Sequence, residues 1–143
     1  MLQNNLKSLL KYEFFQFIEH DITKPIDLDI DLIYNLACPA SPFHYQNSPV
    51  KTIKTNITGA LNMLDLARKR NIKILQASTS EIYGDPKVHP QNEEYWGNVN
   101  TLGPRSMYDE SKRFAESATH SYITTHNLNG SIARTVSYTH LTL

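Results

Sequence analysis

Apolar residues in this chain form two kinds of pattern, short continuous runs and longer stripes at helical spacing. Compact runs at 32–37 and 73–78 predict two buried strands. Between them, apolar residues recur every third or fourth position of 49–70, which predicts a helix with one buried face. Ser48 and Pro49 suit the start of this helix, because Ser48 offers a capping hydroxyl and proline lacks only an amide that the first turn leaves unused. The stripe consists of Val50, Ile53, Ile57, Ala60, Leu61, Leu64 and Ala67.

A second helical stripe covers 105–126, and its expected stop lies between Asn127 and Gly130. A further strand is expected to begin at Ile132. The stripe consists of Met107, Phe114, Ala115, Ala118 and Tyr122. Strands and helices thus alternate, which favours a parallel sheet covered by helices. We therefore expect a single domain with a partial Rossmann-like, doubly wound α/β fold.

The first part of the chain carries weaker patterns. Leucines at helical spacing within 1–13 are compatible with a short amphipathic helix. The apolar and aromatic run 14–18 predicts a strand, and the polar residues 19–21, followed by Ile22, stand at its end. The segment 85–104 has no periodic pattern, and we expect it to be a loop over the site, anchored by Tyr95 and Trp96.

Composition narrows the possible partners. Fourteen basic and fourteen acidic side chains balance in 143 residues, so no surplus charge drives binding to nucleic acid or to an anionic membrane. Cys38 is the only cysteine, which excludes an intrachain disulfide and fits a reducing compartment. No apolar run reaches the length of about 18 residues that a membrane helix needs. We expect a cytoplasmic location, with a membrane-anchored Golgi parent as an open alternative.

Metal and hydrolase chemistry both lack their usual residues. The six histidines form no close ligand pattern, so no metal site is expected. No serine or cysteine nucleophile is accompanied by a positioned histidine, as hydrolysis by a triad requires.

Tyr108 and Lys112 are the first candidates for catalysis. They are four positions apart in the helix expected over 105–126, so they share one face. An ammonium beside a phenol favours the phenolate and lowers the phenol pKa from its usual value of about 10. Such a tyrosine can remove a hydroxyl proton. A surface helix also carries such a pair by chance, so the interpretation depends on a partner segment.

That partner is the polar segment that follows the strand at 73–78. Ser78, Thr79, Ser80 and Glu81 stand at the carboxyl end of this strand, which is the edge where ligands bind in open parallel sheets. The same residue types also cap turns, which is the alternative interpretation. Both segments together favour a site.

Four motifs contain or flank these residues. Thr-Ser-Glu-Ile-Tyr-Gly-Asp stands at 79–85, Tyr-Trp-Gly at 95–97, and Gly-Pro-Arg at 103–105 precedes Tyr-Asp-Glu-Ser-Lys-Arg at 108–113. With these motifs the chain resembles, from about residue 20 to residue 134, the extended short-chain dehydrogenase/reductase superfamily. Within it, the chain is similar to the UDP-glucuronic acid decarboxylases, also called UDP-xylose synthases.

The resemblance implies an internal redox cycle on a sugar nucleotide. Bound NAD would oxidise C4 of UDP-glucuronate, the β-keto acid would lose carbon dioxide, and the hydride would return to give UDP-xylose. Tyr108 would be the base for the 4-hydroxyl, Lys112 would lower its pKa and bind the nicotinamide ribose, and Thr79 would hydrogen-bond the reacting oxygen. Ser80 and Glu81 would face C5 and its carboxylate, where Glu81 could assist the loss by repulsion.

The resemblance also implies where cofactor and substrate bind. The cofactor-binding set is Asp21, Ile22, Leu36, Ala37, Cys38, Asn56, Ser78, Tyr108 and Lys112, and the substrate-binding set is Pro39, Tyr45, Thr79 and Arg105. Three of these have plainer alternatives. Asp21 could be an ordinary turn residue, Cys38 a small buried filler, and Asn56 a boundary residue of its helix.

The chain departs from the family at both ends. It contains no Gly-x-Gly-x-x-Gly, although the family binds the dinucleotide pyrophosphate with that loop. We therefore expect an internal fragment that lacks the first β-α-β phosphate-binding unit, is inactive alone, and ends in a non-native tail at 135–143.

Two alternatives to a decarboxylase stay open, and a homodimer is expected in addition. One is a related sugar-nucleotide 4,6-dehydratase or 4-epimerase, although dehydratases of the superfamily usually carry Thr-Asp-Glu where this chain has Ser80 in the middle position. Another is a non-catalytic fragment or pairing module. In either case, the helices 49–70 and 105–126 are expected to form a homodimer interface, as they do in the family.

Overall fold

The computed structural model describes residues 6–136. Within these residues, three parallel strands form one sheet in the order β1-β2-β3, namely β1 (Leu32–Asn35), β2 (Lys73–Thr79) and β3 (Gly130–Thr135). Ile33 stands opposite Ile74, and Gln76 stands opposite Ile132. The carboxyl ends of all three strands therefore meet at one edge of the sheet.

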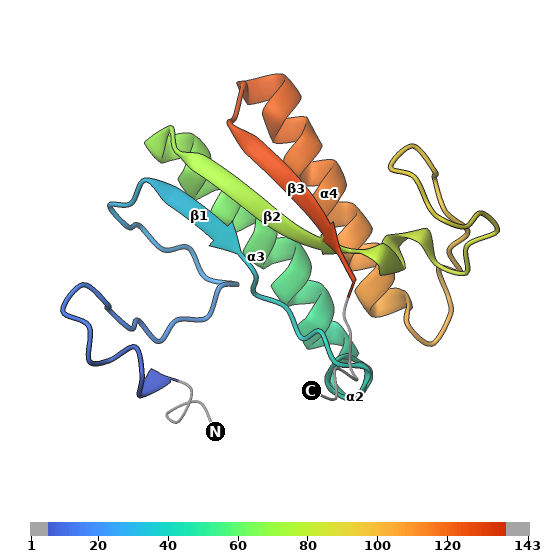
Figure 1. Ribbon diagram of the computed structural model, residues 1–143, viewed down its shortest axis with the longest axis horizontal. Coiled ribbons are helices and arrows are strands. Elements are labelled where there is room, and N and C mark those ends of the chain that lie inside the picture. The colour runs from blue at the N-terminus through green and yellow to red at the C-terminus, as the bar shows by residue number, and fades with distance from the viewer. Residues whose placement is uncertain (1–5, 137–143) are drawn as a thin grey trace.

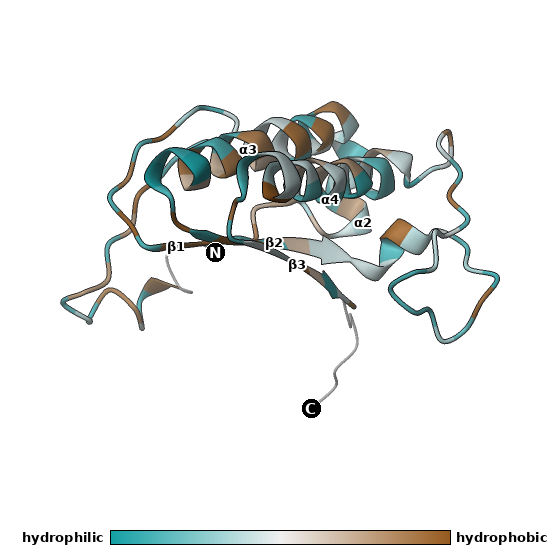
Figure 2. Cartoon of the chain, turned by 90° about the horizontal axis from the view of Figure 1, so that it is seen from above, coloured by the Kyte–Doolittle hydropathy of each residue, from teal (hydrophilic) through white to brown (hydrophobic). Residues whose placement is uncertain are grey.

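Two long helices connect the strands and lie on the same face of the sheet (Figure 1, Figure 2). They are α3 (Pro49–Arg70), between β1 and β2, and α4 (Ser106–His126), between β2 and β3. Two short elements, α2 (Pro42–Asn47) and the 3-10 helix η1 (Ser80–Tyr83), follow β1 and β2. The expected parallel α/β fold is confirmed, and within the described residues the two long helices cover one face of the sheet.

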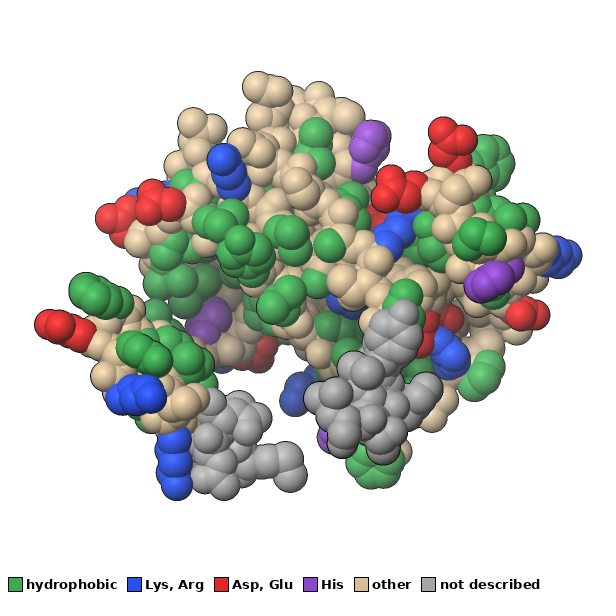
Figure 3. Space-filling view, in the orientation of Figure 1, with side chains coloured by type: hydrophobic (Ala, Val, Ile, Leu, Met, Phe, Trp, Pro, Cys, Tyr) green, Lys and Arg blue, Asp and Glu red, His purple; other side chains and the backbone are tan. Residues whose placement is uncertain are grey.

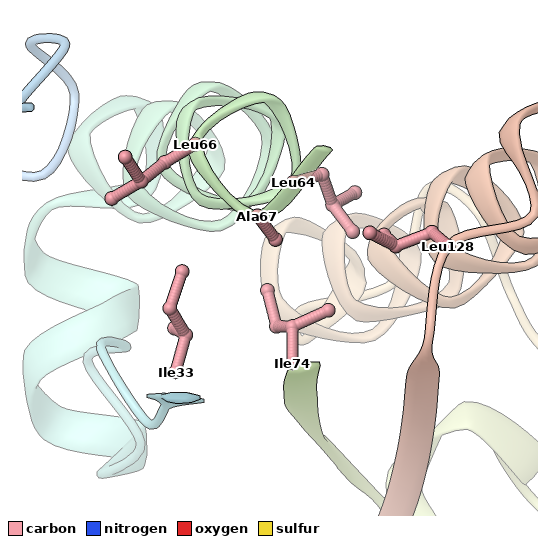
Figure 4. Close-up of a cluster of buried hydrophobic side chains, with 6 residues drawn as sticks. All are labelled: Ile33, Leu64, Leu66, Ala67, Ile74 and Leu128. Atoms are coloured by element: carbon pink, nitrogen blue, oxygen red, sulfur yellow. The ribbon is translucent and has the colours of Figure 1, made fainter. Parts of the chain in front are cut away.

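The core lies between the sheet and the two helices. Ile33 from β1 and Ile74 from β2 point toward Leu64 and Ala67 of α3, and Leu128 closes the cluster (Figure 4). All five side chains are buried, and burial of each large aliphatic one contributes about 1.5–3 kcal/mol. The opposite face of the sheet is open, and apolar side chains gather over it (Figure 3), with Tyr34 64% exposed.

Both long helices end in the same way. The residues after them, Asn71 and Asn127, adopt the left-handed conformation with φ of 53°, and each donates its backbone N–H to a carbonyl of the last turn. Asparagine tolerates this conformation better than most residues, so it serves as a helix stop. The stop expected after residue 126 is thus confirmed. Strand β3 begins at Gly130, two residues before the expected Ile132.

The strand expected at 14–18 is wrong. In the described residues no strand lies beside this segment, and Phe14 is 98% exposed. A strand exists only through hydrogen bonds to a neighbouring strand, and strand propensity does not supply that neighbour. The helix expected over 1–13 is also not formed from residue 7 onward, where hydrogen-bonded turns follow instead. Residues 1–5 of that prediction lie outside the described residues.

The loop from Gly84 to Arg105 is held against the rest of the fold by backbone contacts. Gly84 has φ of +66° and pairs with Asn98, whose carbonyl oxygen would lie 2.3 Å from an added Cβ. Tyr95 stacks on Tyr83 at 5.8 Å, which confirms its expected anchoring role. The same expectation for Trp96 is wrong, because its side chain is 89% exposed and only its carbonyl is held, by Arg113 at 3.2 Å.

Two findings bear on the ends of the chain. Thr135, expected to begin a tail, is the last residue of β3, whereas residues 137–143 lie outside the described residues. The non-native tail therefore stays a prediction. Neither of the long helices α3 and α4, within the part of the chain that the structure describes, is apolar enough to cross a membrane.

Candidate active site

Helix α4 delivers Tyr108 and Lys112 to the carboxyl end of β2. The Lys112 ammonium Nζ donates to the carbonyl oxygen of Ala77 at 2.9 Å and lies 5.9 Å from the centroid of the Tyr108 ring. Both side chains are buried, with 6% of Tyr108 and 4% of Lys112 exposed. The two residues that sequence spacing placed on one face therefore do meet at the strand edge where ligands bind.

The polar segment after β2 lies beside them. Thr79 ends the strand, and its hydroxyl faces the Tyr108 phenol, where it stabilises the phenolate and so lowers the phenol pKa. The same hydroxyl accepts a hydrogen bond from the Glu81 amide at 3.2 Å, so Thr79 also caps η1. Thr79 therefore lies in the candidate site and also caps the following turn, so the two interpretations of this segment do not exclude each other. Ser80 is half-buried in the first position of η1.

Burial changes the pKa of Tyr108 more strongly than the neighbouring residues do. Removal of the phenol from water disfavours the phenolate and raises the pKa of Tyr108 to about 12, although the Thr79 hydroxyl acts in the opposite direction. Burial also lowers the pKa of Lys112. The expectation that Lys112 lowers the phenol pKa stays a prediction, since burial is the largest cause of the upward shift in this structure. The Lys112 ammonium is directed to the Ala77 carbonyl.

Tyr45 of α2 completes the wall of the site. Its ring is fully buried and stacks on the Tyr108 ring, with centroids 4.9 Å apart and planes 15° apart. Its hydroxyl is buried, and within residues 6–136 it finds no hydrogen-bond partner. Ser78 Oγ is in the same situation. Buried polar atoms normally have partners, so these two hydroxyls are candidates for contact with a bound molecule.

Asn56 and Ser111 connect the two long helices behind the site. The Asn56 side-chain amide donates to the Ser111 hydroxyl at 2.7 Å, and that hydroxyl donates to the Met107 carbonyl at 2.6 Å. Both residues are buried. Asn56 is thus more than a boundary residue, since it holds the turn of α4 that carries Tyr108. The contribution of Ser111 was missed by sequence reasoning, because serine in a helix gives no specific signal.

The segment after β1 lies at the same strand edge, since β1 pairs with β2 in parallel register. Leu36 is 67% exposed, and the amide of Ala37 donates weakly to the Asn35 side chain at 3.4 Å. The Pro39 carbonyl accepts from the half-buried Cys38 thiol at 3.5 Å. Burial raises the pKa of Cys38, with the Lys112 charge acting against it. Cys38 is therefore a thiol neighbour of Lys112 and not an activated nucleophile.

Asp21 and Ile22 stand against α3, away from the hydrogen bonds described above. Asp21 Oδ1 accepts from the amide and the hydroxyl of Thr23, at 3.0 and 2.9 Å, and these bonds lower the pKa of its carboxyl. This is the geometry of a turn residue. Ile22 packs so closely on Gly59 that an added Cβ would lie 2.8 Å from its Cγ2. Asn62 fixes the Ile22 carbonyl with a hydrogen bond of 2.9 Å.

A cluster of three charged residues, Glu81, Arg105 and Asp109, adjoins Tyr108, and only Asp109 of the three is buried. Arg105, at the start of α4, forms an ion pair with Glu81 of η1. Asp109 is 8% exposed, and its carboxyl approaches that of Glu81. Burial raises the pKa of Asp109 to about 6, Arg105 acts against the rise, and Glu81 adds to it. Asp109 was missed as a site residue, although it follows Tyr108 directly and stands four positions after Arg105.

A cavity of about 500 Å³ adjoins this cluster. Arg105 and Asp109 line one part of it, and the loop from Gly84 to Arg105 lines the remainder. The loop thus lies over the cluster, as expected of a segment that covers the site. The arrangement offers a phenol, an ammonium, a hydroxyl and a carboxyl pair at one sheet edge, which suits proton transfer to and from a bound molecule.

Comparison with known proteins agrees with this geometry. The family model described as GDP-mannose 4,6 dehydratase matches residues 5–140. UDP-glucuronic acid decarboxylase 6 of Arabidopsis thaliana is 54% identical over 132 residues, which are 92% of this chain and 38% of that protein. The chain therefore spans well under half the length of this relative. The resemblance to UDP-glucuronic acid decarboxylases is confirmed.

Solved structures with a similar fold include sugar-nucleotide epimerases and dehydratases. A UDP-N-acetylglucosamine 4-epimerase from Methanobrevibacter ruminantium M1, in complex with UDP-N-acetylmuramic acid, is 25% identical with a TM-score of 0.65, over 81% of this chain and 36% of that one. A DesIV double mutant (dTDP-glucose 4,6-dehydratase) from Streptomyces venezuelae, with NAD and DAU bound, has a TM-score of 0.77 at 20% identity, over 92% and 41%. This second likeness supports the fold alone. By the match of its residues 5–140, the chain belongs to the GDP-mannose 4,6 dehydratase family.

Proposed function

We propose that this chain is the catalytic segment of an NAD-dependent UDP-glucuronate decarboxylase that forms UDP-xylose. One observation carries the proposal, namely the 2.9 Å hydrogen bond by which Lys112 joins α4 to the carboxyl end of β2. This contact places Tyr108, Lys112 and Thr79 around one point at the ligand-binding edge of a parallel sheet. The 54% identity to an Arabidopsis UDP-glucuronic acid decarboxylase supports this substrate over other sugar nucleotides.

The residues at this edge suit NAD. Ser78 has a buried hydroxyl for which the described residues offer no partner, and the backbone of 36–38 is accessible at the same edge. We propose that these residues, with Asn56, Tyr108 and Lys112, hold the nicotinamide half, and that Asp21 and Ile22 reach the adenine half. When bound, NAD supplies the hydride acceptor and donor for C4.

Tyr108 is the proposed base for the 4-hydroxyl. Its pKa of about 12 keeps the phenol protonated at neutral pH in this structure. A positive charge brought next to the phenol lowers that pKa, and oxidised nicotinamide carries such a charge. We therefore propose that Tyr108 ionises only when the cofactor-binding residues are occupied, with Lys112 and Thr79 supporting the phenolate. Thr79 also hydrogen-bonds the sugar O4, and the unpartnered hydroxyl of Tyr45 binds the substrate beside Pro39.

Arg105 and Glu81 have linked roles. Arg105 was expected to contact substrate, but its guanidinium is ion-paired with Glu81. We propose that Arg105 positions Glu81 toward C5 of the sugar, next to Ser80. Because Arg105 offsets the charge of Glu81, repulsion between Glu81 and the departing carboxylate is weak. Loss of carbon dioxide then depends mainly on the 4-keto group, which accepts the electron pair of the broken C5–C6 bond.

A homodimer through the two long helices is part of the proposal. α3 and α4 lie side by side on one face of the sheet (Figure 2), and a groove of about 810 Å³ runs between them. Ile53 of α3 and Phe114 of α4 line this groove and are 38% and 40% exposed. Exposed apolar side chains on two neighbouring helices suit a second copy that presents the same surface.

We also propose that the enzyme is located in the cytoplasm. The single cysteine of this chain is in accord with such a reducing compartment.

The test uses a full-length decarboxylase in which the matching segment is replaced by this chain, here called the grafted enzyme. We expect the grafted enzyme to bind NAD and to convert UDP-glucuronate to UDP-xylose and carbon dioxide. A 6-deoxy-4-keto product would identify a 4,6-dehydratase, and a 4-epimerised uronate would identify an epimerase. Either product would overturn the proposal, as would NAD binding without any turnover, which would indicate a non-catalytic segment.

A further inference from the structure

The proposed reaction needs two proton donors after carbon dioxide has left. When the C5–C6 bond breaks, its electron pair forms an enolate across C4 and C5. C5 must then take one proton, which restores the 4-keto group, and O4 must take another when the hydride returns to C4. Tyr108 holds a single proton, the one it removed from the 4-hydroxyl. If Tyr108 serves O4, another group has to serve C5.

The cluster next to Tyr108 has the composition of such a second donor. Glu81 lies at the carboxyl end of β2, and its carboxyl approaches that of Asp109. A second carboxylate nearby makes ionisation of Asp109 costly, so Asp109 keeps its proton to higher pH than an isolated carboxyl does. Arg105 is ion-paired with Glu81 and supplies a positive charge when that proton has left. The cluster can therefore hold and release one proton without leaving two negative charges unbalanced.

Asp109 is the member of the cluster suited to storing the proton. Its side chain is 92% buried, and its Oδ1 atom has no hydrogen-bond partner within residues 6–136. It lines the cavity of about 500 Å³, which Glu81 does not. Asp109 thus stands between Glu81, on the side of the sugar, and a space large enough for water. Charged or titratable groups that face it are Glu81, Arg105 and Tyr45, with Glu110 on its own helix and Asp85 on the cavity wall.

We propose that Asp109 stores the proton that decarboxylation consumes and passes it to C5 through Glu81. This inference rests on the proposed function. Asp109 passes its proton to Glu81, Glu81 passes it on to C5, and water in the cavity returns one proton to Asp109. One proton is taken up from solvent for each uronate carboxylate that leaves as carbon dioxide, so charge and atoms balance. Asp109 does not touch the sugar and is a positioning residue that acts through Glu81.

The test is a single turnover of the grafted enzyme, followed through the ultraviolet absorbance of NADH. NADH forms when C4 is oxidised and disappears when the hydride returns, after C5 has been protonated. In Asp109→Asn we expect unchanged NADH formation and a decay slowed about 100-fold. With Asp109 present, the decay should slow as pH rises through the Asp109 pKa of about 6. In Asp109→Asn this pH dependence should be lost.

Asp85→Asn is the matched control, because Asp85 lines the same cavity and is exposed. We expect this variant to keep both the decay rate and its pH profile. An unchanged decay and pH profile in Asp109→Asn would overturn the inference, since C5 would then receive its proton by another route. If Asp109→Asn fails to form NADH because it does not fold, Asp109→Glu decides. Its decay should keep a pH dependence with a shifted midpoint, and an unshifted midpoint would overturn the inference.

Failure of the proposed function has a different signature. A grafted enzyme with Asp109 intact that makes no UDP-xylose would refute the function itself, whatever the variants do. Normal UDP-xylose formation with no effect of Asp109→Asn would refute only the role of Asp109.

Discussion

The rings of Tyr45 and Tyr108 stack with centroids 4.9 Å apart and planes 15° apart. Tyr45 comes from α2 and Tyr108 from the first turn of α4, so the stack joins the segment after β1 to the segment after β2. Tyr45 is fully buried, and its hydroxyl has no protein partner among the described residues. Its ring therefore supports the fold, and its hydroxyl is the group that we propose for the substrate contact.

Two substitutions separate these contributions. Tyr45→Phe keeps the stacked ring and removes an unpartnered hydroxyl, so the free energy of unfolding should change by less than about 1 kcal/mol. KM for UDP-glucuronate should rise about tenfold, since a hydrogen bond to the substrate is worth about 1.4 kcal/mol. Tyr45→Ala removes the ring and should lower the unfolding free energy by about 3–5 kcal/mol. Urea denaturation and steady-state kinetics of the grafted enzyme measure both effects, and an unchanged KM in Tyr45→Phe would exclude the substrate contact.

Arg134 of β3 ties the loop from Gly84 to Arg105 to the sheet. Its guanidinium binds the Glu116 carboxylate at 2.8 Å, the Glu93 carbonyl at 2.9 Å and the Tyr83 hydroxyl at 2.9 Å. Arg134→Ala leaves Glu116, whose side chain is 12% exposed, without its cation. We expect a loss of about 3 kcal/mol in unfolding free energy and faster proteolysis within the loop. The control is Arg68→Ala, because the Arg68–Asp65 pair is 3.7 Å long and more than half exposed and is worth less than about 1 kcal/mol.

Asp109 makes stability depend on pH. Its pKa is raised from 3.8 to about 6, so the folded state holds a proton that the unfolded state has already lost between these values. Stability from this group is fully present below pH 3.8 and is lost as pH rises through about 6. The full shift corresponds to at most about 3 kcal/mol. Asp109→Asn should therefore be more stable than the parent at pH 8 and equally stable near pH 4, as measured by urea denaturation. Equal stability at pH 8 would mean that Asp109 ionises there without cost.

The proposed dimer depends on the groove between α3 and α4. Phe114→Glu puts a charge into an apolar contact, and burial of an unpaired charge is costly. Analytical ultracentrifugation of the grafted enzyme should show a dimer for the parent and a monomer for Phe114→Glu. Val88→Glu, which changes an exposed apolar residue of the loop outside this groove, should remain dimeric. A monomeric parent would refute the dimer.

Sequence patterns correctly predicted the helices and strands whose own residues mark where they begin and end. The helix over 49–70 was correct at both ends, because Pro49 marks its start and Asn71 adopts the left-handed conformation after its last turn. The strand at 14–18 was wrong, since a strand depends on a neighbour that local sequence does not describe. Trp96 was misplaced for a related reason, because its backbone and not its ring makes the contact.

Site residues that belong to a sequence motif could be predicted. Properties that depend on burial, such as the pKa of a side chain, could not. Spacing placed Tyr108 and Lys112 on one face, and the hydrogen bond from Lys112 to the Ala77 carbonyl bears this out. The direction of the Tyr108 pKa shift could not be predicted, because it depends on how much water reaches the phenol. Asp109 was missed because a carboxylate on a helix is usually solvated. Only the fold shows that it is buried against Glu81.

We propose Tyr108 as the acid-base group of a UDP-glucuronate decarboxylase. The most direct measurement is UDP-xylose formation by the grafted enzyme carrying Tyr108→Phe, with Tyr122→Phe as control, because Tyr122 lies on the same helix and bonds Asp65 on the outer surface. We predict that Tyr108→Phe still binds NAD and UDP-glucuronate but forms UDP-xylose about 100- to 10,000-fold more slowly, while Tyr122→Phe keeps the parental rate. UDP-xylose formation at the parental rate by Tyr108→Phe would contradict the claim.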